Sequence, residues 1–428
     1  PPGPKKGIIM TKMNIVDLGD GVSLGLVKNT KFKSNLISIY FQRQLDRQEV
    51  TRISLLTNLL QVATNKYPSM KAISQKLDSL YGLSMNLGLS KHGEKLITSL
   101  KLLSISDRYL DQPVFEDVID FASEILLNPL VVDGQLNPDK LDLEKKNLEE
   151  EIGSKINDKR TYASLRCIEH MCKDELYSID HIGYIEDLDS ISAKDIYETY
   201  KDLISTSRIF IMVEGDFDED KVRDLCIEKF KFKRANVQNL SREDYGYMSA
   251  PIRYFEEDMA TSQGKLVIGL RTGVDYMDYD RYYSLMLANS ILGGGPHSKL
   301  FNNVREKESI CYYASSNLEK TKGLMFISSG IDIENYDRAI ELIRRELDDT
   351  RQGKISQLEL DNAKKSLINS LKAIGDSIVS DVEFTYNQYI SGSKLTVEDV
   401  IGYVEKVDID MIIESMKDVK EDTVFFLK

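Results

Sequence analysis

Cysteine and histidine are the side chains best suited to bind zinc or act as nucleophiles, and three of them cluster at Cys167, His170 and Cys172. Cys167 and His170 would share one face of a helix. At about 100° per residue, however, Cys172 lies roughly 140° around the helix from Cys167. A helix whose small cysteines pack in the core therefore explains this cluster better than a metal site does.

Histidine spacing excludes a helical zinc-peptidase motif. An HxxEH site needs two histidines four residues apart, because they must share a helix face, with the intervening glutamate as base on the metal-bound water. The four histidines are His92, His170, His181 and His297, and no two have that spacing. His92 stands alone in a turn and is expected at the surface. A G-x-S-x-G or Cys/His signature is also absent, so independent proteolysis is not expected.

Composition indicates a globular, cytoplasmic protein of 428 residues. A formal charge of −13 argues against general nucleic-acid binding, which requires basic residues to neutralise phosphates. Apolar runs are far shorter than the roughly 18–20 residues of a membrane-spanning helix. Four cysteines are too few for a disulfide framework and suit a reducing compartment. Residues 1–6 (PPGPKK) are expected to form an irregular leader outside the fold.

The first half of the chain begins with strand patterns and continues with helices. Apolar runs at 13–18 and 22–27 flank a Gly-Asp-Gly turn and precede an alternating stretch at 36–41, which predicts an antiparallel sheet. Helical periodicity covers 52–63 and 70–81, separated by Pro68-Ser69 as break and cap. The remaining predicted elements are a strand pair at 83–89 and 95–102, helices at 115–127 and 138–156, a strand at 208–213 and a helix at 219–230.

The second half repeats this order after a polar stretch at 231–249, which is the predicted linker. The counterparts of 55–81, 115–127 and 143–156 are 282–312, 336–347 and 358–374, and each half closes on an apolar strand. Internal repeats determine architecture. The sequence therefore predicts an α+β protein with two homologous repeats, at 7–230 and 250–428. Each would be an antiparallel sheet covered by helices, and the two would face one another across a cleft.

This order of elements resembles the pitrilysin/insulinase superfamily of zinc metallopeptidases, which includes the mitochondrial processing peptidases. Residues 147–152 (NLEEEI) are similar to the helix that supplies the family's carboxylate zinc ligand. Residues 213–218 (VEGDFD) are similar to its Gly-Asp strand end. The most specific segment is 292–312 (LGGGPHSKLFNNVREKESICY), which resembles the family's Gly-rich turn, helix and Arg/Tyr pair.

The resemblance places the zinc motif on the helix before Pro68, where its ligands are missing. The three functional places are taken by Ser54, Thr57 and Asn58. Glu144 and Glu151 lie seven apart on one helix face and match the family's distal carboxylates, yet they cannot hold zinc tightly without histidine partners. The alternative for both is a solvated glutamate on a charge-rich helix. No metal or cofactor is expected on this chain.

Arg305 and Tyr312 match the pair that the family's second domain sends across the cleft. The resemblance implies that Tyr312 donates a hydrogen bond to the oxyanion of the tetrahedral intermediate and that Arg305 holds a substrate carbonyl. The alternatives are a surface ion pair of Arg305 with a neighbouring glutamate and a half-buried strand position for Tyr312. The seven-residue spacing fits either a continuous helix or a helix end that leads into a strand.

Gly293, Gly294 and Gly295 precede this helix as a glycine-rich turn. They lack the G-K-[ST] ending of a phosphate-binding loop, so nucleotide binding is not predicted. Three glycines would instead permit close backbone approach or a hinge at the mouth of the cleft.

Two hypotheses on function follow. In the first, the chain is the zinc-less, non-catalytic subunit of a heterodimeric zinc peptidase, whose homologous partner carries HxxEH and the zinc. It would donate Arg305 and Tyr312 to the composite site and hold an extended peptide by strand addition. In the second, it is a peptide-binding or structural protein without a catalytic partner. A self-sufficient peptidase with an unusual metal site is a less favoured third alternative. Neither nucleic acid nor membrane is an expected partner.

Overall fold

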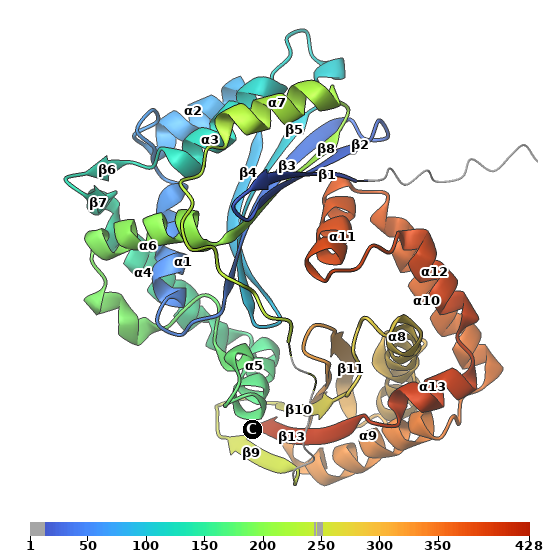
Figure 1. Ribbon diagram of the computed structural model, residues 1–428. Helices are drawn as coiled ribbons and strands as arrows, with labels where there is room; N and C mark the ends of the chain where they lie inside the picture. Colours follow the sequence, from blue (N-terminus) through green and yellow to red (C-terminus); the bar gives the residue numbers. More distant parts are fainter. Residues whose placement is uncertain (1–12, 244, 246–250) are drawn as a thin grey trace, which may run out of the picture.

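A computed structural model describes residues 13–243, 245 and 251–428, which form two α+β halves (Figure 1). The expected leader at 1–6 lies outside the described residues, as do residue 244 and residues 246–249 of the expected linker. Within the described part, no helix combines the length and the apolar character needed to cross a membrane. The predicted α+β class is confirmed.

The first half is built on a six-stranded sheet with the order β1-β2-β8-β3-β5-β4. The long central strands β3 and β5 are paired over eleven positions, from Ser34 opposite Ile105 to Gln44 opposite Lys95. Neighbouring strands are antiparallel except β2 and β8, which are parallel. The strands are β1 (Asn14–Gly19), β2 (Val22–Lys28), β3 (Ser34–Gln44), β4 (Ser84–His92), β5 (Lys95–Ile105) and β8 (Arg208–Gly215), with a separate pair β6 (Val131–Val132) and β7 (Gln135–Leu136).

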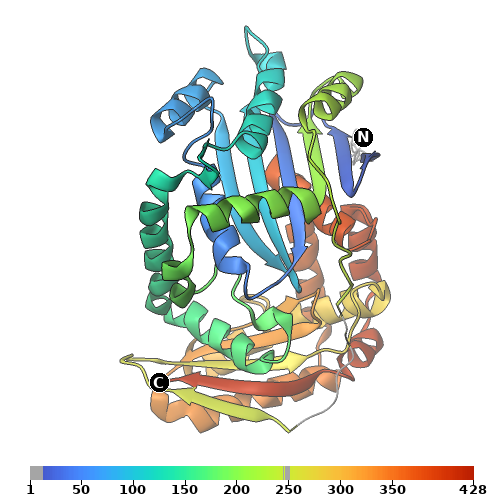
Figure 2. The same cartoon turned by 60° about the vertical axis from the view of Figure 1, so that its left-hand side comes forward.

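Helices of the first half cover one face of this sheet through a continuous apolar core, and Figure 2 shows this helical layer in front of the strands. The helices of this layer are α1 (Val50–Leu60), α2 (Met70–Ser79), α3 (Phe115–Leu127), α4 (Pro138–Ser154), α6 (Ala193–Thr206) and α7 (Glu219–Lys229). The remaining helix, α5 (Lys159–Met171), packs elsewhere. The predicted cap is present, because the Ser69 hydroxyl accepts a hydrogen bond from the Ala72 amide at 3.2 Å.

The second half has a five-stranded sheet with the order β11-β12-β10-β13-β9. Its strands are β9 (Arg253–Glu257), β10 (Gly264–Arg271), β11 (Cys311–Glu319), β12 (Leu324–Ile331) and β13 (Lys420–Leu427). Its helices are α8 (Tyr279–Gly293), the π-helical segment η5 (Leu300–Lys307), α9 (Tyr336–Arg351), α10 (Gln357–Ile374), α11 (Ile378–Ile390), α12 (Val397–Lys406) and α13 (Ile409–Met416). Again one pair, β13 with β9, is parallel.

The strand orders of the two halves match, which confirms the predicted repeat. The order β4-β5-β3-β8-β2 in the first sheet corresponds to β11-β12-β10-β13-β9 in the second. In both, the last strand of the half is placed in the interior of the sheet beside the first long strand. Each sheet is therefore mainly antiparallel, as predicted, with one parallel pair that the prediction did not include.

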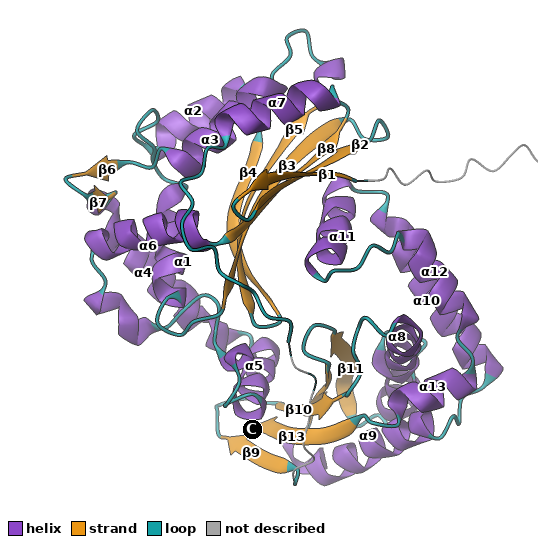
Figure 3. Cartoon of the chain, in the orientation of Figure 1, coloured by secondary structure: helices purple, strands orange, loops and turns teal. Residues whose placement is uncertain are grey.

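One helix of each half packs on the sheet of the other half, an exchange that the sequence patterns do not reveal. Helix α5 packs on the second sheet, where Cys167 lies in one apolar cluster with Val267 and Phe425. Helix α11 packs on the first sheet, where the Tyr386 ring stacks on Tyr40 with 3.6 Å between centroids. Figures 1 and 3 show both helices on the sheet faces opposite to the local helical layers. The two α+β halves thus interlock.

A pair of carboxyl groups, one buried and one half-buried, lies where α11 meets the first sheet. Glu214, at the end of β8, is fully buried, and its Oε1 accepts a hydrogen bond from Asn29 Nδ2 at 2.9 Å. Burial, followed by the proximity of Asp381 on α11, raises the pKa of Glu214 to about 8. Burial also raises the pKa of Asp381. The hydrogen bond with Glu214 and the charge of Lys31 oppose this rise, and the charge of Glu398 adds to it. The neutral form of Glu214 is therefore the one that fits this interface.

Glu214→Gln is expected to remove a pH-dependent loss of stability. A carboxyl whose folded pKa is raised contributes stability below its unfolded pKa of about 4.3, and this contribution is lost as pH rises through the folded pKa near 8. Between these limits the wild type should lose up to a few kcal/mol relative to the glutamine variant. Denaturant unfolding at several pH values measures this, with exposed Glu414→Gln as the control. A wild-type-to-variant difference that stays constant across the window would contradict the assignment.

Candidate functional site

Arg305 lies on η5, which links the glycine turn to β11. The Glu308 amide bonds to the Asn303 carbonyl at 3.2 Å, an i to i−5 contact typical of π-helical geometry, which is frequent at functional sites. The Arg305 side chain is 40% exposed. Its guanidinium lies 4.6 Å from the centroid of the Phe301 ring, and its Nε is 3.6 Å from a Glu306 oxygen. The anticipated ion pair with Glu306 is thus present, in an exposed and weak form.

Tyr312 stands in a bulge at the start of β11. The helix does not continue to it, since Ser309 has a φ of +54° and β11 begins at Cys311. Cys311 is opposite Ile331 and Tyr313 is opposite Gly330, so Tyr312 has no cross-strand partner. Bulges of this kind redirect a side chain. Of the two arrangements that the seven-residue spacing allowed, the structure has the helix end that leads into a strand.

The Tyr312 ring is 51% exposed, and its hydroxyl donates a hydrogen bond to Asp332 Oδ1 at 2.8 Å. This bond to a carboxylate raises the pKa of Tyr312, so the phenol keeps its proton at neutral pH. Tyr312 is therefore a hydrogen-bond donor on an accessible surface, currently directed at Asp332.

The glycine turn is pressed against β11. A Cβ on Gly293 would collide with the backbone nitrogen of Ser316, so close approach is the role that the structure gives this glycine. The turn is closed by a 3.1 Å hydrogen bond between Ser290 Oγ and His297 Nε2. Arg305, Tyr312 and the glycine turn thus border the same strand.

A pocket of about 260 Å³ lies between the turn and this strand. Its lining combines both halves of the chain: Arg160 of α5, Gly293, Gly294, Gly295, Pro296, Phe301 and residues 314–317. None of these lining residues is acidic. The pocket therefore joins the glycine turn, the ring beneath Arg305 and an arginine that the sequence patterns did not single out.

The vacated zinc positions lie on α1, which packs beside α4. Ser54 and Thr57 are buried, and the Thr57 hydroxyl donates to the Ile53 carbonyl at 2.8 Å, so it is satisfied within its own helix. Asn58 is half-buried. Hydroxyl and amide groups do not replace the histidine ligands of zinc. No group of three His, Cys, Asp or Glu side chains that could hold a metal ion occurs within residues 13–243, 245 and 251–428.

The two residual carboxylates have different environments. Glu151 is exposed, as expected for a solvated glutamate on a charge-rich helix. Glu144 is only 8% exposed and accepts a hydrogen bond from Asn147 Nδ2 at 3.3 Å, so that alternative is wrong for Glu144. The difference arises because Glu144 is among the residues that α4 turns inward with Leu141 and Leu148.

The Cys167, His170 and Cys172 cluster has the packed environment predicted for it. Both thiols are fully buried, and burial raises their pKa values, that of Cys172 to about 12. The His170 ring instead stacks on Phe255 with 4.0 Å between centroids. A Cβ on Gly269 of β10 would lie 2.6 Å from Met171 Sδ, which shows how closely α5 sits on the second sheet.

The prediction that His92 lies at the surface is wrong. It is half-buried at the tip of the β4–β5 hairpin, and its Nε2 has no hydrogen-bond partner among the described residues. Burial, reinforced by Lys320, lowers its pKa to about 4. His92 is therefore neutral near pH 7, and its hairpin packs against Glu243 and Thr321 of later segments.

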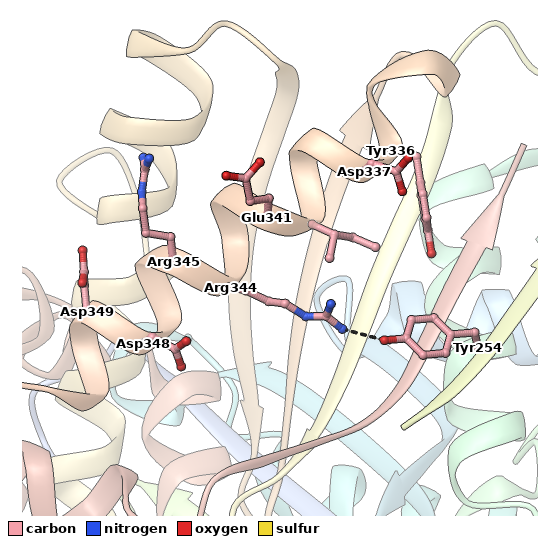
Figure 4. Close-up of a pocket in the computed structure, with 9 residues that line it drawn as sticks. Tyr254, Tyr336, Asp337, Glu341, Arg344, Arg345, Asp348 and Asp349 are labelled. Carbon is pink, nitrogen blue, oxygen red and sulfur yellow. Dashed lines mark hydrogen bonds between the residues drawn. The ribbon is translucent and has the colours of Figure 1, made fainter. Parts of the chain in front are cut away.

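A larger pocket, of about 750 Å³, lies on the outer side of α9 next to β9 (Figure 4). Most of its charged side chains are paired with other protein groups, and Asp337 is the exception among the lining residues. Arg344 binds Glu421 and also donates to the Tyr254 hydroxyl at 2.9 Å. Arg345 lies 3.3 Å from a Glu346 oxygen. Apart from the single carboxylate of Asp337, this surface therefore offers space rather than a set of unpaired groups that would select a ligand.

Comparison with known proteins relates the chain to zinc-peptidase homologues. Residues 190–367 match the family model described as the Peptidase M16 inactive domain. The chain is 31% identical over 410 residues to the probable inactive metalloprotease YmfF of Bacillus subtilis, covering 95% of this chain and 96% of that protein. It is 24% identical over 235 residues to the uncharacterized zinc protease YmxG of the same organism, covering 54% and 56% of the two chains.

Solved structures show the same fold. A conserved protein from Enterococcus faecalis V583 superposes with a TM-score of 0.91 at 30% identity, over 98% of this chain and 99% of that one. A peptidase M16 inactive domain from Pseudomonas fluorescens superposes with a TM-score of 0.80 at 17% identity, over 97% of each chain.

Proposed function

The chain belongs to the pitrilysin/insulinase-type M16 peptidase family, as a member without the HxxEH zinc motif, and we propose that it serves as the non-catalytic subunit of a heterodimeric zinc peptidase. The partner would be a homologous chain that carries HxxEH and the zinc. This chain would hold an extended peptide and donate Arg305 and Tyr312 to the shared site. Four free, buried cysteines suit the cytoplasm as its location.

The observation that carries the proposal is that the zinc ligands of the first half are missing while the substrate-binding residues of the second half are present. On α1 the metal-binding places hold Ser54, Thr57 and Asn58, whose chemistry does not fit zinc. In the second half, Tyr312 is exposed on a bulge, Arg305 is accessible on η5, and a pocket follows the same strand. Selection for a scaffold alone would not require an exposed phenol and guanidinium beside a pocket.

The relatives supply a second argument. Bacillus subtilis holds both a probable inactive metalloprotease and an uncharacterized zinc protease that are similar to this chain. One organism can therefore encode both a relative named inactive and a relative named a zinc protease, as a mixed dimer requires. In such a dimer the zinc would activate the attacking water, and this chain would bind and orient the peptide.

Co-expression with an HxxEH-bearing homologue from the same genome tests the proposal. We expect the two chains to co-purify as a 1:1 complex that cleaves peptides, with zinc bound by the partner alone. The control is the Glu→Gln change in the partner's motif, which should abolish cleavage without dissolving the complex. If the homologue cleaves equally well alone and does not bind this chain, the proposal is wrong.

One observation favours the second candidate function, a structural or peptide-binding protein without a catalytic partner. Arg305 and Tyr312 already have internal partners, Glu306 and Asp332. Both contacts are exposed and weak, so a bound peptide could replace them. Peptide cleavage that depends on the mixed complex separates the two functions.

A further inference from the structure

Arg160 is an exposed arginine that forms no direct ion pair among the described residues. It lies on α5, the helix of the first half that packs on the second sheet, and its Nη2 donates to Ser315 Oγ at 3.0 Å. Its guanidinium stacks over Tyr313 with 4.3 Å to the ring centroid. Asp158, the N-cap of the same helix, interacts with the charge of Arg160, but its oxygens accept hydrogen bonds from the Arg160 and Thr161 amides and from the Thr161 hydroxyl. The exposed guanidinium of Arg160 is thus open to a ligand.

Other arginines without ion pairs are satisfied differently. Arg52 donates to the Gln48 carbonyl, Arg208 to the Gln238 carbonyl, and Arg234 to the carbonyls of Ile204 and Ser207. Carbonyls of the main chain thus take their N–H groups. The acceptor of Arg160 is a single hydroxyl, so the guanidinium is held in place by stacking while donors of its planar fork stay available.

The pocket beside Arg160 is suited to an anion. Glycines, Pro296, Phe301, Ala314 and two serines surround it, with Asn317 as a further polar group. A second guanidinium, that of Arg305, lies against Phe301, the ring that forms one wall. Arg305 is itself paired with Glu306, and Arg160 is the one charged residue in the lining of this pocket.

We propose that this pocket binds a carboxylate of the peptide, with the Arg160 guanidinium as its partner. The inference rests on the proposed peptide-binding function and names the chemistry that the site selects. A planar guanidinium can bind a carboxylate through two parallel hydrogen bonds, which gives both affinity and orientation. The carboxylate belongs to an acidic side chain or to the C-terminus of the peptide.

The position of the pocket relates this carboxylate to Tyr312. Ser315, the partner of Arg160, follows Tyr312 by three residues on β11. At about 3.3 Å per residue, that separation is about 10 Å along the strand. A peptide lying along β11 would place its carboxylate about three residues from the bond that faces Tyr312.

Peptide binding by the purified full chain tests the inference without a catalytic partner. The probes are four fluorescein-labelled pools of peptides about nine residues long, random over Ala, Ser, Val, Leu and Gln. The four pools combine one internal Glu, or a Gln in its place, with a free or an amidated C-terminus. The pool with Gln and an amidated C-terminus is the neutral pool. Fluorescence anisotropy should show about tenfold tighter binding to one class of carboxylate-bearing pool than to the neutral pool. The preferred class identifies the carboxylate as side chain or C-terminus.

Substitutions then assign the preference to Arg160. Arg160→Met should remove the preference and leave binding of the neutral pool unchanged, while Arg160→Lys should retain part of it. Arg223→Met on the exposed side of α7 is the control, and thermal melting verifies the fold of each variant. A preference that survives Arg160→Met overturns the inference. Equal binding of all pools also overturns it but leaves the proposed peptide binding intact, whereas binding of no pool overturns both.

Discussion

Replacing Asp422 by alanine should lower the free energy of unfolding by about 3–5 kcal/mol. Asp422 lies on β13 with 4% of its side chain exposed. It accepts hydrogen bonds from Arg271 Nε at 3.0 Å, from Arg253 and from the Thr423 hydroxyl. These contacts hold its pKa below the usual range of an aspartate. Without the buried carboxylate, the partly buried guanidinium groups of Arg271 and Arg253 lose a negative charge that compensates them.

The effect extends beyond one ion pair, because Asp422 belongs to a network that joins the two halves. Arg271 also binds Glu175 of the first half. Glu175 and Glu94 lie 2.7 Å from the ammonium of Lys322, whose side chain is only 4% exposed. Partial removal of such a network leaves buried charges unpaired, which costs more than an exposed pair would.

Denaturant unfolding measures the loss, and Asp418→Ala is the matched control. Asp418 pairs with Arg281 as Asp422 pairs with Arg271, but its side chain is 53% exposed. Exposed pairs contribute about 0–1 kcal/mol, so this control should change stability little. Equal losses in the two variants would contradict the role assigned to burial. Since the network and the exchanged helices span both halves, the wild type should unfold in one transition.

Local structure could be predicted from the sequence wherever a local pattern decides it. Helix α3 has the predicted bounds, because apolar periodicity defines it and Asn128-Pro129 follows its end. The repeat was predictable because each half carries the same succession of patterns. Strand β9 was not predicted, since its five residues alternate only between exposed and half-buried positions and it pairs in parallel with the distant β13.

Long-range packing was beyond the sequence patterns. Nothing in α5 or α11 indicates that each helix packs on the sheet of the other half, because an apolar face does not identify its partner. For the same reason Asp422 and Lys322 resemble ordinary surface charges in the sequence, although both are buried. Their burial depends on partners up to 228 residues away, as for Lys322 and Glu94.

The candidate site shows the same division. The resemblance pointed to Arg305, Tyr312 and the glycine turn, and these border one strand, β11. Arg160 was missed because α5 reaches the pocket only through the helix exchange. Its signal is the absence of a direct ion pair among the described residues, which is visible only in three dimensions. The bulge that exposes Tyr312 likewise depends on the pairing of β11 with β12.

Tyr312→Phe should lower the kcat of the reconstituted complex by about 10²–10³-fold, with a smaller change in KM. The hydroxyl would leave Asp332 and donate to the oxygen that becomes negative in the transition state, so its loss affects the transition state more than substrate binding. Because the pKa of Tyr312 is raised, the phenol should remain a donor throughout the neutral pH range. Peptide cleavage under saturating and limiting substrate separates kcat from kcat/KM.

Tyr254→Phe provides the matched control, because Tyr254 is 54% exposed and its hydroxyl also has a single charged partner, Arg344. It lies on β9 and should leave kcat unchanged. Arg305→Ala should lower kcat/KM through weaker substrate binding. If both residues act on one peptide bond, the loss of transition-state stabilisation in the double variant should be smaller than the sum of the losses in Arg305→Ala and Tyr312→Phe. Full activity in the double variant would show that the pair is a relic. In that case the missing zinc ligands of the first half would be what distinguishes this chain in function from an active homologue.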